Sequence, residues 1–193
     1  NVKFIDKLYD GINKKSKKYR ISIVGGNISH SRQIIINVAL IGFVEKKYLI
    51  LRSGAKVGDL IFCSGDVGKS SIGLELLRHN IKGNSIKKHL EPQCRLDLAR
   101  KLANHGINSM IDVSDGVASE VRHVCEESGV GALVYSDKIP ISKSTINDAK
   151  TLKNSKRIFG AQKISKKFSR ELKIDAVDFA LYGGEDYELV LTA

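Results

Sequence analysis

Apolar residues recur with a helical period in several segments of the chain. In residues 5–18, Ile5, Leu8 and Ile12 fall on one helical face together with Tyr9, and the segment then becomes basic. Similar spacing, supported by cap and breaker residues, predicts further helices at residues 70–79, 93–105, 115–127, 142–152 and 174–181.

Short β-branched or apolar runs separate these helices and predict strands. The longest run, residues 33–44, is rich in Ile and Val and indicates a long buried strand. The other predicted strands are residues 20–24, 48–51, 59–63, 109–113, 131–135 and 188–192. Strands alternating with helices are typical of an α/β or α+β layer structure. Strands dominate before residues 53–58, and the lysine-rich residues 153–172 predict a long surface excursion.

Composition places the chain among ordinary globular proteins, with 42% hydrophobic and 27% charged residues. The longest apolar run has the length of a strand, so no membrane-spanning segment is predicted. Cys63, Cys94 and Cys125 lie far apart without a CxxC pair. This spacing argues against a disulfide framework or a zinc site and predicts reduced thiols in a cytoplasmic protein. The chain starts at Asn1 rather than Met, so we expect a fragment of a longer protein.

The formal net charge of +11 raises the question of nucleic-acid binding. The lysines form short scattered clusters, the chain has no Trp, and no helix-turn-helix, zinc-finger or RNA-binding signature occurs. A solvated basic surface therefore explains the charge better than a nucleic-acid footprint. The positive field would also favour an anionic ligand such as a polyphosphate.

Residues 110–116, Met-Ile-Asp-Val-Ser-Asp-Gly, are the strongest candidate for chemistry. A predicted strand delivers Asp112, Ser114 and Asp115 into a tight turn where a helix begins. The amides and positive dipole end of a helix suit phosphate, and two neighbouring carboxylates favour a hard cation such as Mg²⁺. The residues therefore fit a metal–polyphosphate site. In the alternative, Ser114 and Asp115 only cap the helix, which explains Asp115 well and Asp112 poorly.

Two glycine-bearing segments are weaker candidates. Residues 182–188, Tyr-Gly-Gly-Glu-Asp-Tyr-Glu, place acidic side chains directly after two glycines that allow unusual backbone conformations. Residues 25–29, Gly-Gly-Asn-Ile-Ser, follow a predicted strand, so Gly26 would allow close approach of a ligand and Asn27 would offer an amide. Taken singly, an ordinary loop or turn is the simpler interpretation of each.

Residues 65–70, Gly-Asp-Val-Gly-Lys-Ser, resemble the end of a phosphate-binding P-loop. A P-loop has four residues between its glycines, whereas only two separate Gly65 from Gly68. We therefore reject Walker-type ATP binding at this loop. The five histidines show no metal-binding spacing, and no Ser-His-Asp arrangement follows from spacing.

Taken in order, five segments resemble the thiamine-monophosphate kinase family, which belongs to the superfamily of aminoimidazole ribonucleotide synthetase and selenophosphate synthetase. These segments are residues 24–27, 51–59, 88–92, 111–116 and 182–187. The resemblance covers almost the whole chain, and its specific blocks are Asp-Val-Ser-Asp-Gly and Gly-Gly-Glu-Asp-Tyr. It implies transfer of the γ-phosphoryl group of ATP to thiamine monophosphate, giving thiamine diphosphate with the help of several Mg²⁺ ions. Positioning and charge neutralisation dominate such a reaction.

The resemblance also implies a role for individual residues. Asp112 and Asp115 would be Mg²⁺ ligands, and Glu185 would contact the thiamine-like substrate. Asn27 would lie near a metal and the ATP phosphates; the family commonly has Asp there, and an amide oxygen ligates with less charge. The residues that would bind the nucleotide are Tyr9, Gly26, Asn27, Arg52 and Ser114.

The domain organisation follows from the same resemblance. Residues 1–51 would be the C-terminal part of an N-terminal β-rich domain for ATP binding and dimerisation. Residues 52–193 would be most of an α/β C-terminal domain of the aminoimidazole ribonucleotide synthetase type. The family's N-terminal segment with its Asp-Asp metal motif is absent here, as is the segment after the final strand. We expect a homodimer of the full-length protein, and little kinase activity and a tendency to associate in this chain alone.

Two alternatives are open. The first is another ATP-dependent enzyme of the same superfamily that acts on a different acceptor. The second is a non-catalytic basic module that binds nucleic acid, which would bind DNA or RNA with a steep salt dependence.

Overall fold

The computed structural model describes residues 2–155 and 175–193. The chain splits into two compact units, Asn1–Gly42 and Phe43–Ala193. The predicted surface excursion at residues 153–172 falls almost wholly outside the described residues. The domain boundary predicted between residues 51 and 52 stays a prediction.

The first unit contains one helix, α1 (Val2–Tyr19), which confirms the helix predicted at residues 5–18. Lys17 and Lys18 lie in its last turn, where cations meet the negative end of the helix dipole. Arg20 then takes a left-handed conformation, with φ of 55°, as the chain leaves the helix. No residue of α1 is buried, so its own backbone hydrogen bonds support it more than packing does.

The strands predicted at residues 20–24 and 33–44 are wrong, because the structure has no strand in either segment. Ile34 and Val38, expected to be buried, are 73% and 75% exposed. A strand needs a hydrogen-bonded neighbour, and none of the described residues forms a sheet with these segments. A β-branched composition suits a sheet, but it does not supply the partner strand.

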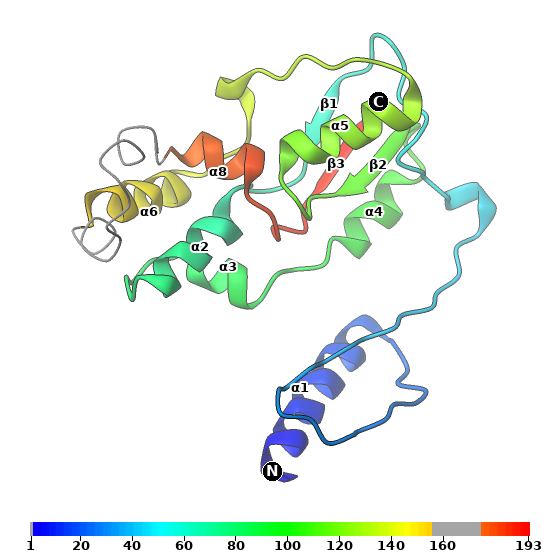
Figure 1. Cartoon of the computed structure of the whole chain (residues 1–193). Helices are drawn as coiled ribbons and strands as arrows, with labels where there is room; N and C mark the ends of the chain where they lie inside the picture. Colours follow the sequence, from blue (N-terminus) through cyan, green and yellow to red (C-terminus); the bar gives the residue numbers. More distant parts are fainter. Residues whose placement is uncertain (1, 156–174) are drawn as a thin grey trace. The chain divides into compact units, whose positions relative to one another are not determined.

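A three-stranded antiparallel sheet organises the second unit (Figure 1). Its strands are β1 (Ile61–Cys63), β2 (Ser109–Asp112) and β3 (Leu189–Thr192), in the order β1-β3-β2. All four residues of β3 are buried. Because β1 and β2 both run antiparallel to β3, their C-terminal ends lie beside the N-terminal end of β3. The segments that follow β1 and β2 therefore meet the segment that precedes β3 at one end of the sheet.

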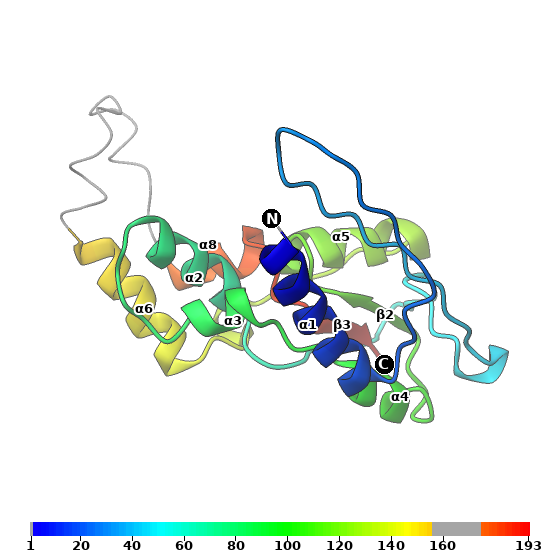
Figure 2. The same ribbon diagram turned by 90° about the horizontal axis from the view of Figure 1, so that it is seen from below.

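Six helices accompany the sheet in the described part of this unit. They are α2 (Lys69–Arg78), α3 (Ile86–Leu90), α4 (Leu96–Leu102), α5 (Val117–Ser128), α6 (Lys143–Asn154) and α8 (Ala176–Tyr182), and two short 3-10 turns lie at Lys46–Tyr48 and Ser136–Lys138. Figure 2 shows α5 on one face of the sheet and α4 on the other. The helices α2, α4, α5, α6 and α8 confirm predicted ones.

Three element predictions in this unit need correction. The helix α3 was not predicted, because its five residues are too few to show a period. The strands predicted at residues 48–51 and 131–135 are wrong, since both segments lie outside the sheet. Leu133, for example, is exposed.

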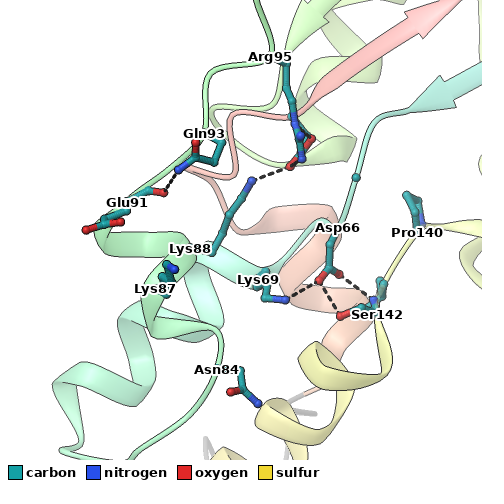
Figure 3. A pocket seen from close by; sticks show the side chains of 13 residues that line it. Asp66, Lys69, Asn84, Lys87, Lys88, Glu91, Gln93, Arg95, Pro140 and Ser142 are labelled. Atoms are coloured by element: carbon teal, nitrogen blue, oxygen red, sulfur yellow. Dashed lines mark hydrogen bonds and ion pairs between the residues drawn. The ribbon is translucent and has the colours of Figure 1, made fainter. Parts of the chain in front are cut away.

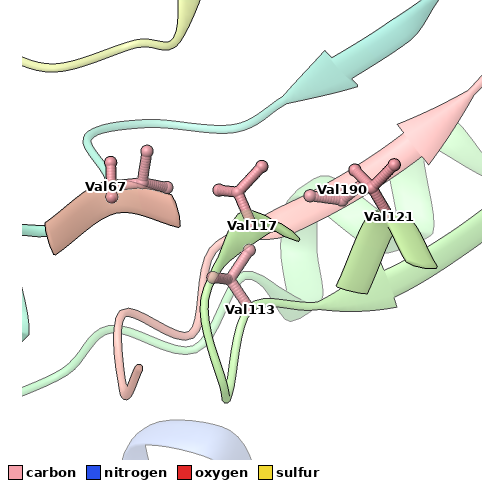
Figure 4. Close-up of a cluster of buried hydrophobic side chains, with 6 residues drawn as sticks. Val67, Val113, Val117, Val121 and Val190 are labelled. Carbon is pink, nitrogen blue, oxygen red and sulfur yellow. The ribbon is translucent and has the colours of Figure 1, made fainter. Parts of the chain in front are cut away.

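Two apolar cores hold the second unit together. The first lies between the sheet, α5 and α8, and Figure 4 shows its valines. It consists of Val67, Val113, Val117, Val121, Ala180 and Val190. The second joins α2, α6 and α8 through Ile72, Leu76, Ala149, Leu152 and Ala176. Burial of aliphatic side chains such as these is the main stabilising contribution to a fold of this size.

Among the described residues, no helix combines the length and the apolar character that crossing a membrane would require.

Candidate active site

The turn that follows β2 pairs with the segment that precedes β3. Val113 N–H donates to the Glu188 carbonyl at 2.7 Å, and Tyr187 N–H donates to the Val113 carbonyl at 2.9 Å. Glu185 N–H donates to the Ser114 carbonyl at 2.8 Å. The two most specific motifs of the sequence, residues 112–116 and 183–187, thus lie side by side, and Glu188 continues the second. We call these two segments the paired turns.

Two glycines make this close pairing possible. A Cβ on Gly184 would overlap the Ser114 carbonyl oxygen, so only glycine fits there. Gly116 has φ of 102°, and a Cβ on it would lie 2.6 Å from the Leu181 carbonyl oxygen. The backbone of Glu185 is itself left-handed, with φ of 67°. Strained backbone of this kind in a non-glycine residue is often found at functional sites.

Ser114 and Asp115 do not cap α5, so the helix-cap interpretation is wrong. The N-cap residue is Gly116, and no side chain accepts a capping hydrogen bond there. Ser114 instead donates its hydroxyl to Glu120 Oε1 at 3.2 Å, and the Asp115 backbone N–H donates to the same oxygen at 3.0 Å. Asp112 and Asp115 are both exposed, so their carboxylates are accessible to a ligand.

A hollow of ≈ 620 Å³ opens at this turn. Four predicted site residues line it, namely Arg52, Asp112, Ser114 and Asp115, with Glu120 and His123 beside them. Arg52 is held by Glu127, whose Oε1 lies 2.6 Å from Arg52 Nη2. One cation and several carboxylates therefore share a single hollow, which suits a ligand that carries both phosphate and metal ions.

The other predicted nucleotide-binding residues belong to the first unit. A Cβ on Gly26 would lie 3.3 Å from the Tyr9 hydroxyl oxygen, so Tyr9 and Gly26 are close neighbours. Asn27 follows Gly26 and is exposed. That these residues and those of the hollow bind the same nucleotide is an expectation from the family resemblance.

Glu185 does not line the hollow. Its side chain is 58% exposed, and Oε2 lies 3.5 Å from His89 Nδ1. Ser70 Oγ lies 3.1 Å from the same ring nitrogen. A Ser-His-Glu relay needs a different imidazole nitrogen for each partner, so this arrangement is not a nucleophilic triad. It leaves Glu185 near the surface, where it can meet a substrate.

Asp186, in the same paired turn, explains the loop that resembles a P-loop. Its fully buried carboxylate accepts from Gly68 N–H at 2.6 Å and from Ser70 N–H at 2.8 Å. Burial raises the pKa of this carboxyl to about 6, although the two amides oppose the shift. The amides at the start of α2 thus bind an internal carboxylate, which agrees with the rejection of Walker-type ATP binding.

Glu188 occupies the centre of a buried ionic network. Arg95 Nε and Nη2 approach its oxygens at 2.6 and 2.7 Å, and Lys88 Nζ approaches at 2.6 Å. A second hollow, of ≈ 700 Å³, lies here and is lined by Lys69, Lys87, Lys88 and Arg95 (Figure 3). Sequence reasoning missed this network, because Arg95 and Glu188 are 93 positions apart and carry no local signal.

No group of three or more His, Cys, Asp or Glu side chains is arranged to hold a metal ion in the part of the chain that the structure describes.

The chain resembles proteins of one family in sequence. The family model "AIR synthase related protein, C-terminal domain" matches residues 56–159, which is more than half of the chain. The thiamine-monophosphate kinase of Aquifex aeolicus is 31% identical over 197 residues, covering 99% of this chain and 57% of the relative. That of Buchnera aphidicola subsp. Acyrthosiphon pisum is 34% identical over 185 residues, covering 91% of this chain and 49% of the relative.

Solved structures agree with the sequence relatives. AaThiL complexed with AMPPCP and TMP superposes with a TM-score of 0.73 at 27% identity, covering 100% of this chain and 57% of that chain. Thiamine-monophosphate kinase from Stenotrophomonas maltophilia K279a superposes with a TM-score of 0.59 at 27% identity, covering 78% of this chain and 44% of that chain.

These likenesses confirm the predicted family resemblance and the α/β fold of the aminoimidazole ribonucleotide synthetase type. The chain spans about half the length of the curated relatives it matches. On the match over residues 56–159, the chain belongs to the family of AIR synthase related proteins and contains that family's C-terminal domain.

Proposed function

We propose that the protein carrying this chain is a thiamine-monophosphate kinase, which transfers the γ-phosphoryl group of ATP to thiamine monophosphate and forms thiamine diphosphate. The observation that carries the proposal is the pairing of the two motif turns. Their backbones hydrogen-bond to each other, and one of them places Asp112, Ser114 and Asp115 in a hollow with Arg52. The thiamine-monophosphate kinases among the relatives support the same activity.

Mg²⁺ fits the donor set of the hollow. Asp112, Ser114 and Asp115 offer oxygen atoms alone, which hard cations prefer. Mg²⁺ in phosphoryl-transfer sites is commonly held by one or two carboxylates, with water and phosphate oxygens completing the shell. Two carboxylates in one turn therefore suffice as the protein's share, and Asn27 would add an amide oxygen. Bound Mg²⁺ would neutralise phosphate charge during transfer.

The remaining roles follow the same proposal. Arg52, held by Glu127, would present a fixed cation to the nucleotide, and Ser114 would contact it from the paired turns. Tyr9 and Gly26 would bind the nucleotide from the first unit, and Glu185 would contact thiamine monophosphate. The binding of AMPPCP and TMP by AaThiL supports this assignment of substrates.

The larger organisation belongs to the proposal too. Residues 1–51 would be the end of an ATP-binding and dimerisation domain, and residues 52–193 the α/β domain. The protein would be a cytoplasmic homodimer.

Calorimetric titration with AMPPCP tests the metal–nucleotide site in the protein that carries this chain. Affinity should rise strongly when Mg²⁺ is present, and Asp112→Ala should weaken the Mg²⁺-dependent binding by about tenfold or more, since a charged ligand of the metal is lost. Asp137→Ala is the matched control, because Asp137 is exposed and outside the hollow. Unchanged binding by Asp112→Ala would refute the metal assignment.

A competing enzymatic activity follows from the family model, which describes AIR synthase related proteins in general. Such a protein could use ATP with a different acceptor. ATP turnover driven by thiamine monophosphate, but not by aminoimidazole precursors, would support the kinase. The reverse result would support the competitor.

A further inference from the structure

Glu120 is a charged residue on the buried face of α5. The residues that share this face are Val117, Val121 and Val124. Glu120 is only 2% exposed, although a glutamate is seldom buried unless it has partners. Its position therefore requires a polar interaction that repays desolvation. The paired turns supply that interaction.

The partners of Glu120 are two consecutive residues of the candidate site. Its Oε1 accepts the Ser114 hydroxyl at 3.2 Å and the Asp115 backbone N–H at 3.0 Å. A carboxylate accepts hydrogen bonds and a serine hydroxyl has one proton to give. That proton is committed to Glu120, so Ser114 Oγ has only lone pairs left for a ligand. Glu120 also lines the same hollow as Ser114 and Asp115.

We propose that Glu120 is a positioning residue, which fixes the direction of the Ser114 hydroxyl and the backbone of Asp115 by accepting their hydrogen bonds. Ser114 Oγ then accepts a hydrogen bond from an N–H or O–H group of the ligand, or contacts a cation bound with it. An unprotonated phosphate oxygen could not receive a hydrogen bond from it. The identity of the ligand as a nucleotide rests on the proposed kinase function.

Substitution of Glu120 distinguishes two modes of action. If Glu120 acts by accepting hydrogen bonds, a neutral acceptor of the same length can replace it. If it acts by its negative charge, as a metal ligand would, a neutral residue cannot replace it. Glu120→Gln keeps a carbonyl oxygen within reach of Ser114 and Asp115, whereas Glu120→Ala removes it. Glu126→Gln, on the exposed side of the same helix, is the control for a lost charge.

Hydrogen exchange at the Asp115 amide tests the geometry without any ligand or activity. Protection should be kept in Glu120→Gln and in Ser114→Ala, and it should fall to the level of an open turn in Glu120→Ala. Unchanged protection in Glu120→Ala would overturn the proposal. This readout holds even if the protein proves not to be a kinase, so failure of the proposed function is seen separately.

Steady-state kinetics and Mg²⁺–AMPPCP titration of the protein that carries this chain test the consequence for the site. We expect Glu120→Ala to lose about tenfold or more in affinity and in kcat/KM, and Glu120→Gln to stay within about threefold of the wild type. Adding Ser114→Ala to Glu120→Ala should cost less than the sum of the two single losses, because both act through one contact. The proposal would be overturned if Glu120→Gln lost as much affinity and kcat/KM as Glu120→Ala. It would also be overturned if Glu120→Ala unfolded at a lower temperature but kept the affinity and the kcat/KM of the wild type.

Discussion

Glu188 illustrates how individual acids of the motif segment are stabilised. Its side chain is 1% exposed, and it accepts hydrogen bonds from Arg95, Lys88 and Ser64. Burial by itself would raise the pKa of this carboxyl, but those three partners outweigh it and lower the pKa. The folded chain therefore favours the ionised form of Glu188. Its contacts hold the start of β3 beside α3 and beside the segment that follows α3.

Glu188→Gln should lower the free energy of unfolding by about 1–3 kcal/mol, because the charge-assisted hydrogen bonds from Arg95 and Lys88 are lost while both cations keep some access to water. Urea denaturation at neutral pH measures the change. Glu91→Gln is a matched control, since Glu91 lines the same hollow but is exposed, and its cost should stay below about 0.5 kcal/mol. Equal costs for the two variants would contradict the importance of the network.

The lowered pKa of Glu188 also sets the sign of a pH dependence. A carboxyl whose folded-state pKa lies below its unfolded value contributes stability above the unfolded value, here 4.5, and loses it as the pH falls through the folded pKa. The stability difference between wild type and Glu188→Gln should therefore shrink as the pH falls below about 5. Between pH 7 and about pH 5 the difference also includes Asp186, because Glu188 helps to raise the pKa of that carboxyl to about 6. Denaturation midpoints below about pH 5 measure the contribution of Glu188, and a difference that grew there would be contrary to the expectation.

Local spacing decided which site residues could be predicted from the sequence. Asp112, Ser114 and Asp115 follow one another in a strand-to-helix turn, so they could be proposed together. Glu120 had a usable signal, since a glutamate interrupts the apolar face of a predicted helix, but its partner could not be inferred from that face alone. Glu188 had no local signal, because its contacts join segments far apart in the chain.

At the scale of elements, helices could be predicted and strands only partly. A helix such as α5 satisfies its backbone within itself, so the period of its apolar residues is sufficient evidence. A strand depends on a neighbour that sequence does not reveal. Residues 59–63, 109–113 and 188–192 contain real strands because they pair with one another, whereas residues 33–44 have no partner among the described residues.

The junction between the paired turns and α5 gives a prediction about an element boundary. Gly116 needs a backbone conformation that is essentially reserved for glycine, and a Cβ would also overlap the Leu181 carbonyl. Gly116→Ala should therefore cost roughly 3–5 kcal/mol of unfolding free energy, from strain and overpacking together.

Gly129, at the other end of α5, provides the control for that substitution. It is also left-handed, with φ of 67°, but nothing lies within 4 Å of a Cβ placed on it. Gly129→Ala should cost only about 1–2 kcal/mol, from backbone strain alone. Urea denaturation of both variants measures their losses of unfolding free energy. Similar losses would show that the contact with Leu181 is unimportant.

At the scale of the whole molecule, the two units differ in how their apolar residues are used. The second unit buries part of its apolar side chains in two cores around the sheet and the helices. The first unit leaves α1 without a buried residue and its β-branched run exposed. The second unit therefore has the packing of a folded domain, and the first unit has apolar surface that favours association.

That exposed run predicts self-association of the 193-residue chain, in keeping with the proposed dimer. Ile34, Ile36 and Val38 are 73%, 55% and 75% exposed in a segment that pairs with no strand of the described residues, which makes it a template for pairing with a second copy. Sedimentation should show a mass that rises with protein concentration. Ile36→Lys with Val38→Lys should return the chain to the monomer, whereas Val57→Lys, a change at a 93% exposed position of the second unit, should not. A chain that stays monomeric throughout, or equal effects of both changes, would show that this run does not drive association.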